Sequence, residues 1–301
     1  MRKRTIIWLC LAALLVLLGL GLLTFAMAAN GWDVTKLDTT VYETNTYEIG
    51  EDFHDLTIYT DTADVFFARS EDGTCKVVCR EESKVKHTVF VQNGVLTVQV
   101  KNEKEWFDFI GFGLEHTKIT IYLPNAEYGN LHIVGSTGDV QLSHDFRFDQ
   151  VSIGMSTGHI HLDNISAKMI ELSASTGDII AAGIECEADV AVYVSTGRAE
   201  LSDVVCRNVK STGSTGDISL KRVLAEEGIH IERSTGDVVF DESDAAEIYV
   251  RGGTGDVKGS LLTGKTFSVK TSTGSIDVPQ SVTGGMCEIF TTTGDVHLTI
   301  G

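Results

Sequence analysis

The chain has 301 residues, of which 42 are acidic and 24 are basic, so its formal net charge is −18 at pH 7. This acidic balance disfavours nucleic acid and anionic lipid headgroups as partners, because both repel negative charge. Cations, basic polymers, envelope proteins and glycans stay open as partners.

The first 29 residues predict a membrane segment. Arg2, Lys3 and Arg4 lie in residues 1–5, and residues 6–29 carry no charge. About 20 apolar residues span a bilayer as a helix, and basic residues before the span favour a cytoplasmic N-terminus. We therefore expect a short cytoplasmic tail, one transmembrane signal anchor in the cell membrane and an extracytoplasmic remainder. The triplet Ala26-Met27-Ala28 resembles a signal-peptidase site, so a cleaved signal peptide is the alternative.

Residues 30–124 are strand-like without a regular repeat, and we interpret them as an N-terminal β cap. Residues 89–98 predict a hairpin around Asn93-Gly94, and residues 58–66 resemble a degenerate copy of the later repeat. An aromatic cluster in this region is a candidate contact patch if exposed, although packing within the cap is the simpler interpretation. Its members are Trp106, Phe107, Phe109 and Phe112.

Residues 125–301 contain the tripeptide Ser-Thr-Gly or a close variant nine times, usually followed by Asp, at a spacing of 19 or 20 residues. A fixed period of this size indicates a repeat architecture in which each unit buries its apolar face against its neighbours. The central threonines are Thr137, Thr157, Thr176, Thr196, Thr215, Thr235, Thr254, Thr273 and Thr293.

Each repeat predicts two short strands joined by this turn. Apolar and polar residues alternate after the turn, as in Ile160-His161-Leu162, and the positions before the turn are also largely apolar. Such alternation marks a strand with one buried face. The fold class is therefore all-β, a β-solenoid with about 19–20 residues per coil. A less regular third segment carries apolar residues at one shared offset, namely Ile165, Ile184, Val204, Val223 and Leu262.

The glycine of every turn is interpreted as structural, because glycine tolerates positive φ and Ser, Thr and Asp side chains can bond the backbone of a tight corner. These glycines are Gly138, Gly158, Gly177, Gly197, Gly216, Gly236, Gly255, Gly274 and Gly294.

Six cysteines include Cys10 in the apolar segment, which leaves an odd number outside it. Cys186 and Cys206 share one offset in adjacent coils, where a spacing of about 4.8 Å falls in the Cα range of a disulfide. A ladder of small buried residues is the alternative, since alanines occupy the same offset in three other coils. The remaining cysteines, Cys75, Cys79 and Cys287, read as ordinary buried residues.

The repeated Asp invites a calcium interpretation, but His159, Arg198 and Ser275 interrupt the series, and hydrogen-bond acceptors in the turns are the favoured role. His159 and His161 point to one side of a strand without a third metal ligand, which favours solvated histidines. No catalytic constellation, cofactor site or metal site is predicted.

The stretch Thr117 to Pro124, followed by Leu131-His132-Ile133 and the first Ser-Thr-Gly-Asp turn, resembles a bacterial putative-adhesin family of cell-envelope proteins. The resemblance covers residues 40–300 and implies a β-solenoid ectodomain with adhesion or envelope sensing as its role, without catalytic residues to carry over. Our first hypothesis is a non-enzymatic, membrane-anchored adhesion, scaffolding or sensing surface. The alternatives are a carbohydrate-active β-helix enzyme and a protein that self-associates through an uncovered C-terminal coil.

Overall fold

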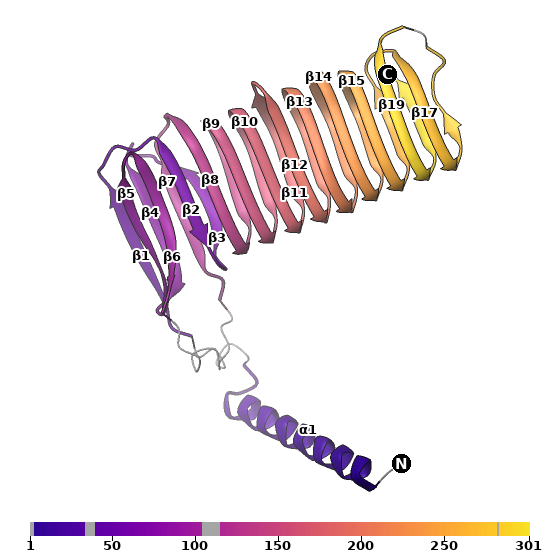
Figure 1. Cartoon of the computed structure of the whole chain (residues 1–301). Coiled ribbons are helices and arrows are strands. Elements are labelled where there is room, and N and C mark those ends of the chain that lie inside the picture. Colours follow the sequence, from indigo (N-terminus) through magenta and orange to yellow (C-terminus); the bar gives the residue numbers. More distant parts are fainter. Residues whose placement is uncertain (1–2, 34–39, 104–114, 282) are drawn as a thin grey trace.

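The computed structural model describes residues 3–33, 40–103, 115–281 and 283–301. One helix, α1 (Lys3–Ala29), precedes a long rod of stacked strands (Figure 1), which confirms the predicted β-solenoid. The strands are β1 (Tyr42–Ile49), β2 (Asp55–Thr60), β3 (Asp64–Arg69), β4 (Cys75–Glu82), β5 (Val85–Gln92), β6 (Val95–Asn102), β7 (Lys118–Leu123), β8 (Glu127–Thr137), β9 (Val140–Thr157), β10 (Ile160–Thr176), β11 (Ile179–Cys186), β12 (Asp189–Thr196), β13 (Ala199–Thr215), β14 (Ile218–Thr235), β15 (Val238–Thr254), β16 (Val257–Leu261), β17 (Lys265–Thr273), β18 (Ile276–Asp277), β19 (Gly285–Thr293) and β20 (Val296–Ile300).

Helix α1 is long and apolar enough to cross a membrane. Leu and Ala, both strong helix formers, dominate its sequence. Most of its apolar side chains are exposed, as the 68% exposure of Leu17 illustrates. A membrane anchor and a signal sequence both have this character, so the anchored form stays a prediction.

One coil of the rod consists of a pre-turn strand, the Ser-Thr-Gly turn and a post-turn strand. Neighbouring coils pair in parallel, and β10 pairs along nearly its whole length with β9. Ile160, Leu162 and Ile165 point inward after one turn of the chain, and Ile170 and Leu172 point inward before the next. The inward residues of successive coils stack into apolar ladders, which supply the hydrophobic driving force of the fold.

The third segment is buried as predicted at Ile165, Ile184, Val204 and Val223. Leu262 is the exception and is 42% exposed. The register of β16 against β15 shifts beyond Phe240. As a result, Leu261 takes the inward place instead.

All nine turn glycines adopt φ between +122° and +148°. A Cβ on Gly158 would lie 1.9 Å from the carbonyl oxygen of Gly138 in the preceding coil, and Gly216 faces the same conflict with Gly197. Both the backbone conformation and the close approach of the coils therefore require glycine.

The residue after each turn glycine belongs to a ladder of side-chain acceptors. Asp139 Oδ1 accepts the backbone N–H of His159 at 2.8 Å, and His159 Nδ1 in turn accepts the N–H of Asp178 at 3.1 Å. Asp217, Asp237 and Asp256 continue this pattern further along the rod. The acceptor role predicted for Asp is thus present, but each side chain bonds the next coil rather than its own turn.

At the N-terminal end of the rod, the predicted hairpin and the degenerate coil are both confirmed. β5 and β6 pair antiparallel around Asn93 and Gly94. β2 and β3 stack in parallel on β8 and β9 as a full coil, and Asp64 Oδ1 accepts the N–H of Asp139 at 2.8 Å. This coil lies inside the predicted cap region, 30–124, and the division at residue 124 stays a prediction.

The segments at the N-terminal end do not stack in chain order. β6 and β7 form the next layer beyond β2 and β3. β4 and β1 then add to β7 in antiparallel order, and β5 adds to β6. Antiparallel strands therefore cover this end of the parallel stack.

The C-terminal end corrects one prediction. β19 lies between β15 and β17, and β20 lies between β16 and β18. β19 is therefore flanked on both sides along its length, and β20 is flanked on both sides at Val296 and His297. The prediction that the last coil forms the uncovered edge is wrong for these residues. After β18 the chain turns back, and β19 pairs between β15 and β17. As a result, β17 and β18 form the terminal edge of the sheet.

Candidate functional site

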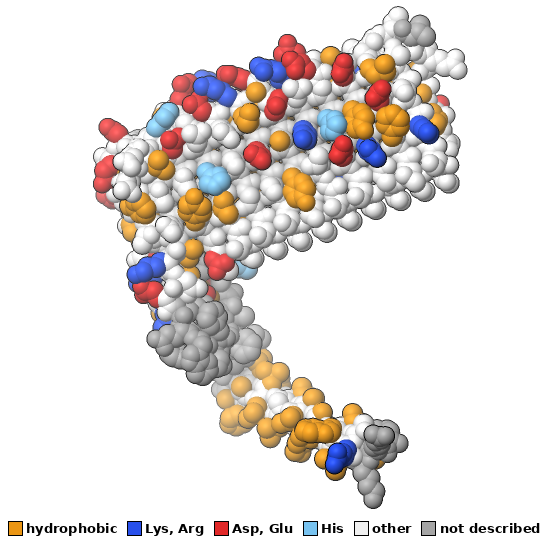
Figure 2. Space-filling view, viewed as in Figure 1, with side chains coloured by type: hydrophobic (Ala, Val, Ile, Leu, Met, Phe, Trp, Pro, Cys, Tyr) orange, Lys and Arg blue, Asp and Glu red, His pale blue; other side chains and the backbone are white. Residues whose placement is uncertain are grey.

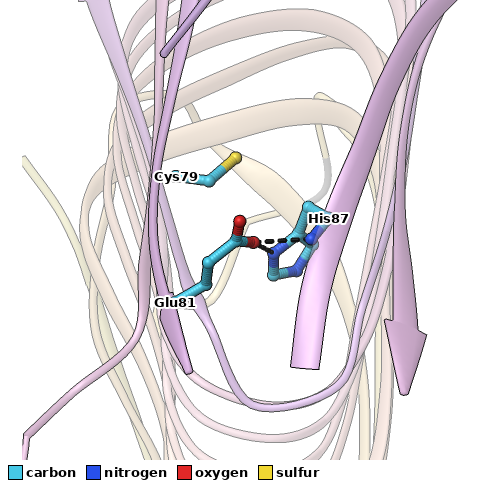
Figure 3. A group of neighbouring side chains, drawn as sticks. All are labelled: Cys79, Glu81 and His87. Carbon is cyan, nitrogen blue, oxygen red and sulfur yellow. Dashed lines mark hydrogen bonds and ion pairs between the residues drawn. The ribbon is translucent and has the colours of Figure 1, made fainter. Parts of the chain in front are cut away.

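The end of β4 and the start of β5 bring three buried polar side chains together inside the cap. Alternation along β4 points Cys75, Val77, Cys79 and Glu81 inward, and His87 points inward from β5. Cys79, Glu81 and His87 each contribute one donor atom to a group whose members lie within 4.8 Å of one another (Figure 3). We call this group the cap cluster.

Hydrogen bonds hold the Glu81 carboxylate in place. Asn45 Nδ2 on β1 donates to Oε1 at 2.8 Å, while the His87 backbone N–H donates to Oε2 at 2.5 Å. His87 Nδ1 lies 2.7 Å from the same Oε2 (Figure 3). A buried carboxylate is tolerable only with such partners, since desolvation penalises its charge.

These hydrogen bonds involve neither His87 Nε2 nor the Cys79 thiol. His87 Nε2 is buried and has no hydrogen-bond partner among the described residues. His87 also lines a small cavity of about 160 Å³, together with Ala63, Val85 and Val100. Burial raises the pKa of the Cys79 thiol to about 12, so the thiol is protonated and is not a nucleophile at neutral pH.

A second feature is the outer surface of the pre-turn strands, which we call the pre-turn face. Its two outward rows contain Tyr59, His132 and Val134 near the cap. Tyr193 lies in the middle, and His230, Tyr249 and Phe290 lie toward the C-terminal end. Figure 2 shows one long side of the rod, where hydrophobic and His side chains lie between charged ones.

The post-turn strands differ from this face. Their corresponding outward row runs through Gln141, His161, Ile180, Glu200, Ser219, Val239 and Lys258 and contains no aromatic residue at these positions. At the cap end the same row continues from Gln141 to Phe66, so the pre-turn face is the more aromatic one only along the rest of the rod.

The aromatic side chains toward the C-terminal end form a continuous patch, which we call the aromatic patch. His230 and Tyr249 stack with ring centroids 4.6 Å apart, and Phe290 follows at 6.1 Å from Tyr249. Tyr193 lies apart from these three rings, on the outward row of Phe290 but separated from it by Thr212, Glu232 and Arg251, and is 44% exposed. Tightly packed rings of this kind form a rigid surface that loses little conformational entropy on binding.

Two shallow hollows adjoin the aromatic patch. One, of about 600 Å³, is lined by residues that include Asn208, Lys210, Tyr249 and Glu288. The other, of about 540 Å³, includes Tyr193, Glu232 and Arg251. Both have the size of a small-ligand site. The first hollow has more acidic than basic residues, and the second has Glu232 against Arg233 and Arg251, so the two hollows together have no uniform charge.

The remaining predicted site residues have varied positions. Cys186 and Cys206 are both buried and carry free thiols, so the disulfide stays a prediction. The aromatic cluster Trp106, Phe107, Phe109 and Phe112 lies outside the described residues. His159 serves the acceptor ladder.

Sequence reasoning missed the cap cluster, because Cys79 read as an ordinary buried residue. One signal was available. The alternation Cys75, Val77, Cys79, Glu81 places a carboxylate at an inward position of a strand. Without the hairpin geometry, however, nothing linked Glu81 to His87.

Comparison with models of known protein families shows to which family the chain belongs. The Toastrack DUF4097 family model matches residues 53–249 and 189–301, which together cover most of the chain and both ends of the rod. The chain belongs to the Toastrack DUF4097 family. This membership confirms the predicted resemblance and fold, and the coils described above are those of a Toastrack domain.

Solved structures similar to this chain include a putative adhesin from Bacteroides fragilis, at 16% identity and a TM-score of 0.47, covering 86% of this chain and 97% of that one. A putative lipid binding protein from Parabacteroides distasonis has 18% identity and a TM-score of 0.41, covering 71% and 96%. A putative adhesin from the same species has 12% identity and a TM-score of 0.42, covering 87% and 98%. None of the curated proteins matches the chain.

Proposed function

We propose that this Toastrack protein is a non-enzymatic, membrane-anchored surface protein that holds its solenoid outside the cytoplasmic membrane and binds a cell-envelope glycan on the pre-turn face. The observation that carries the proposal is the aromatic patch with its two polar hollows. The apolar helix α1 supports the anchored location.

The ligand class follows from the chemistry of the patch. Rings of Tyr193 and Tyr249 offer apolar surface, while Asn208, Glu232 and Arg251 offer hydrogen-bond donors and acceptors. A glycan presents both apolar C–H surface and many hydroxyl groups. The mixed charges around the hollows suit a neutral or zwitterionic polymer better than a polyanion or a polycation.

A non-enzymatic role is supported by the state of the thiols. Burial raises the pKa of Cys75, Cys79, Cys206 and Cys287 to about 12, which disfavours the thiolate form that nucleophilic catalysis needs. The outward row of the post-turn strands mixes polar residues with Ile180 and Val239 and has no acidic or basic cluster among the seven positions named above, which is typical of a solvated surface.

Binding is tested with the full chain in detergent and purified insoluble cell-wall glycan, by measuring the fraction retained. Tyr193→Ala and Tyr249→Ala should each weaken retention at least about tenfold, the range of a truncated aromatic anchor. Ile180→Ala, on the outward row of the post-turn strands, is the matched control and should bind as the parent chain does.

Each part of the proposal has its own contrary result. Retention that survives both tyrosine substitutions would contradict the assigned face. Capture of an envelope protein without any glycan would contradict the ligand class. Release of soluble sugar fragments by the parent chain would contradict the non-enzymatic role, and a mature chain that begins after Ala28 would contradict the anchor.

A further inference from the structure

The cap cluster has the donor set of a metal site rather than that of an ordinary buried ion pair. A simple pair would need only Glu81 and His87, yet the Cys79 sulfur lies in the same group within 4.8 Å (Figure 3). All three side chains are almost fully buried, with exposures of 0% for Cys79, 0% for Glu81 and 4% for His87. Sulfur, imidazole nitrogen and carboxylate oxygen together are the ligands of zinc and its neighbours, not of Ca²⁺ or Mg²⁺.

The group is already organised around Glu81. Asn45 fixes one carboxylate oxygen from β1, and the His87 backbone fixes the other. The contact between Glu81 Oε2 and His87 Nδ1 also orients the imidazole. His87 Nδ1 is therefore the ring nitrogen that lies beside the carboxylate.

The unsatisfied atom of the cluster lies on the imidazole. His87 Nε2 is buried without a partner among the described residues, although buried polar atoms are normally hydrogen-bonded. The adjoining cavity of about 160 Å³ is lined by His87 but by neither Cys79 nor Glu81, and it has space for a water that accepts the Nε2 N–H. His87 Nδ1, which lies beside Glu81, is then the imidazole ligand, and an ion could be held by three side chains and one water, the arrangement of an open tetrahedral site.

Charge balance supports the same conclusion. Among the ion pairs of the described residues, Glu81 has His87 and no Lys or Arg as its partner. A divalent ion bound by a Cys79 thiolate, a Glu81 carboxylate and a neutral imidazole has no net charge. The thiol proton leaves to solvent when the ion binds. A neutral site is favourable where desolvation penalises any net charge.

We propose that Cys79, Glu81 and His87 bind one thiophilic divalent cation, with zinc as the best fit, at the turn between β4 and β5. A tetrahedral zinc ion with bonds of about 2.0–2.3 Å holds its donors roughly 3.5 Å apart. The side chains therefore need only small shifts from their present separations. The bound ion joins β4 to β5 and strengthens the strands that cover the N-terminal end of the rod.

The test uses the full chain in detergent, loaded with Co²⁺ as a spectroscopic substitute for zinc. Tetrahedral Co²⁺ with a thiolate ligand gives a near-ultraviolet sulfur-to-cobalt band and intense visible bands. We expect one equivalent of ion per chain, displacement of the cobalt bands by Zn²⁺, and a higher melting temperature with metal than with chelator.

Variants assign the ligands. Cys79→Ala should abolish the sulfur-to-cobalt band. Cys287→Ala is the matched control, because Cys287 is equally buried and its thiol pKa is also raised to about 12, and it should keep the band. Asn45→Ala removes only a bond to Glu81, so we expect affinity about 10- to 100-fold lower with the band retained.

Several results would overturn the proposal. These are a parent chain that retains no ion after desalting, a spectrum without a sulfur band, or a band that survives Cys79→Ala. If Cys79→Ala does not fold, the spectra of the parent chain and of Cys287→Ala still show whether a thiolate other than Cys287 binds the metal. His87→Gln then tests whether the metal lies in the cap cluster, because this variant must lose the tetrahedral bands.

Discussion

The two ends of the rod have a similar order of coils but differ in whether further strands cover them. At each end, the outermost parallel coil is not the terminal one in the sequence. β6 and β7 lie outside β2 and β3, and β17 and β18 lie outside β19 and β20. The N-terminal end is then covered by the antiparallel strands β4, β1 and β5, whereas among the described strands none covers β17 and β18.

Both ends also bury an acidic side chain beside a basic one where the repeat is broken. Glu81 and His87 lie in the cap, and Asp244 and Lys265 lie 2.5 Å apart at the C-terminal crossover. Between them, the ladders are mostly apolar. This comparison shows that buried polar side chains occur at the ends of the solenoid, because a terminal coil has no identical neighbour to continue the apolar ladder.

The largest effect is expected at the C-terminal pair. Lys265→Met leaves the Asp244 carboxylate buried without its cation, which should destabilise the chain by about 3–5 kcal/mol. Urea unfolding of the full chain in detergent, followed by circular dichroism, measures the loss.

The double variant Lys265→Met with Asp244→Leu is the control. It removes both charges and should recover most of the loss, since a hydrophobic pair often replaces a buried ion pair at little cost. If the single and double variants were equally unstable, the buried charge would not be the cause.

A matched pair of isoleucines measures how differently the ends are covered. Ile119 in β7 and Ile276 in β18 occupy the same position in the post-turn strands of the two outermost coils, yet Ile119 is 0% exposed and Ile276 is 48% exposed. Ile119→Ala should cost about 2–5 kcal/mol, while Ile276→Ala should change stability by less than about 0.5 kcal/mol.

The same unfolding assay compares the two variants. Equal losses would mean that β18 is buried in solution. The natural cause would be a second copy of the chain on the open edge, which light scattering would then reveal.

The centre of the rod offers a third test, since it holds a buried charge without the compensation found at the ends. Arg233 is 4% exposed and donates to Ser211 Oγ at 3.1 Å, but its Nε and Nη1 have no partner among the described residues. Gly213 makes room for it, because a Cβ there would lie 2.3 Å from Nη1.

Arg233→Met removes that buried charge and keeps most of the side-chain volume. We expect stability to increase by about 1 kcal/mol or more. The melting temperature of the full chain checks this expectation. A decrease would show that the guanidinium has a partner in solution, such as an ion.

The regular part of this fold could be read from the sequence, and the ends could not. Period-two alternation around turns such as Ser156-Thr157-Gly158 specifies both strands and the glycine that lets coils approach. The order of the terminal coils depends instead on long-range strand pairing, which places β19 between β15 and β17. A local pattern such as Val296-His297-Leu298 fits either side of β17 equally well. The aromatic patch was equally hidden, because Tyr193, His230 and Phe290 are far apart in sequence and align only once the register is known.

The smallest expected effect concerns acid at the open end. Asp295 Oδ1 accepts the backbone N–H of Ser275 at 2.7 Å and its hydroxyl at 2.9 Å, which ties the outermost coil to the rod. These bonds, the backbone one first, lower the pKa of Asp295. A carboxyl with a lowered folded-state pKa contributes stability above its unfolded value of about 3.9, and this contribution is lost as the pH falls through the folded value.

Proteolysis of the 273–284 segment should therefore accelerate below about pH 4. Asp295→Asn keeps an acceptor oxygen that does not titrate, so its cleavage rate should lack this acid step. An unchanged step in that variant would assign the acid sensitivity to another carboxyl group.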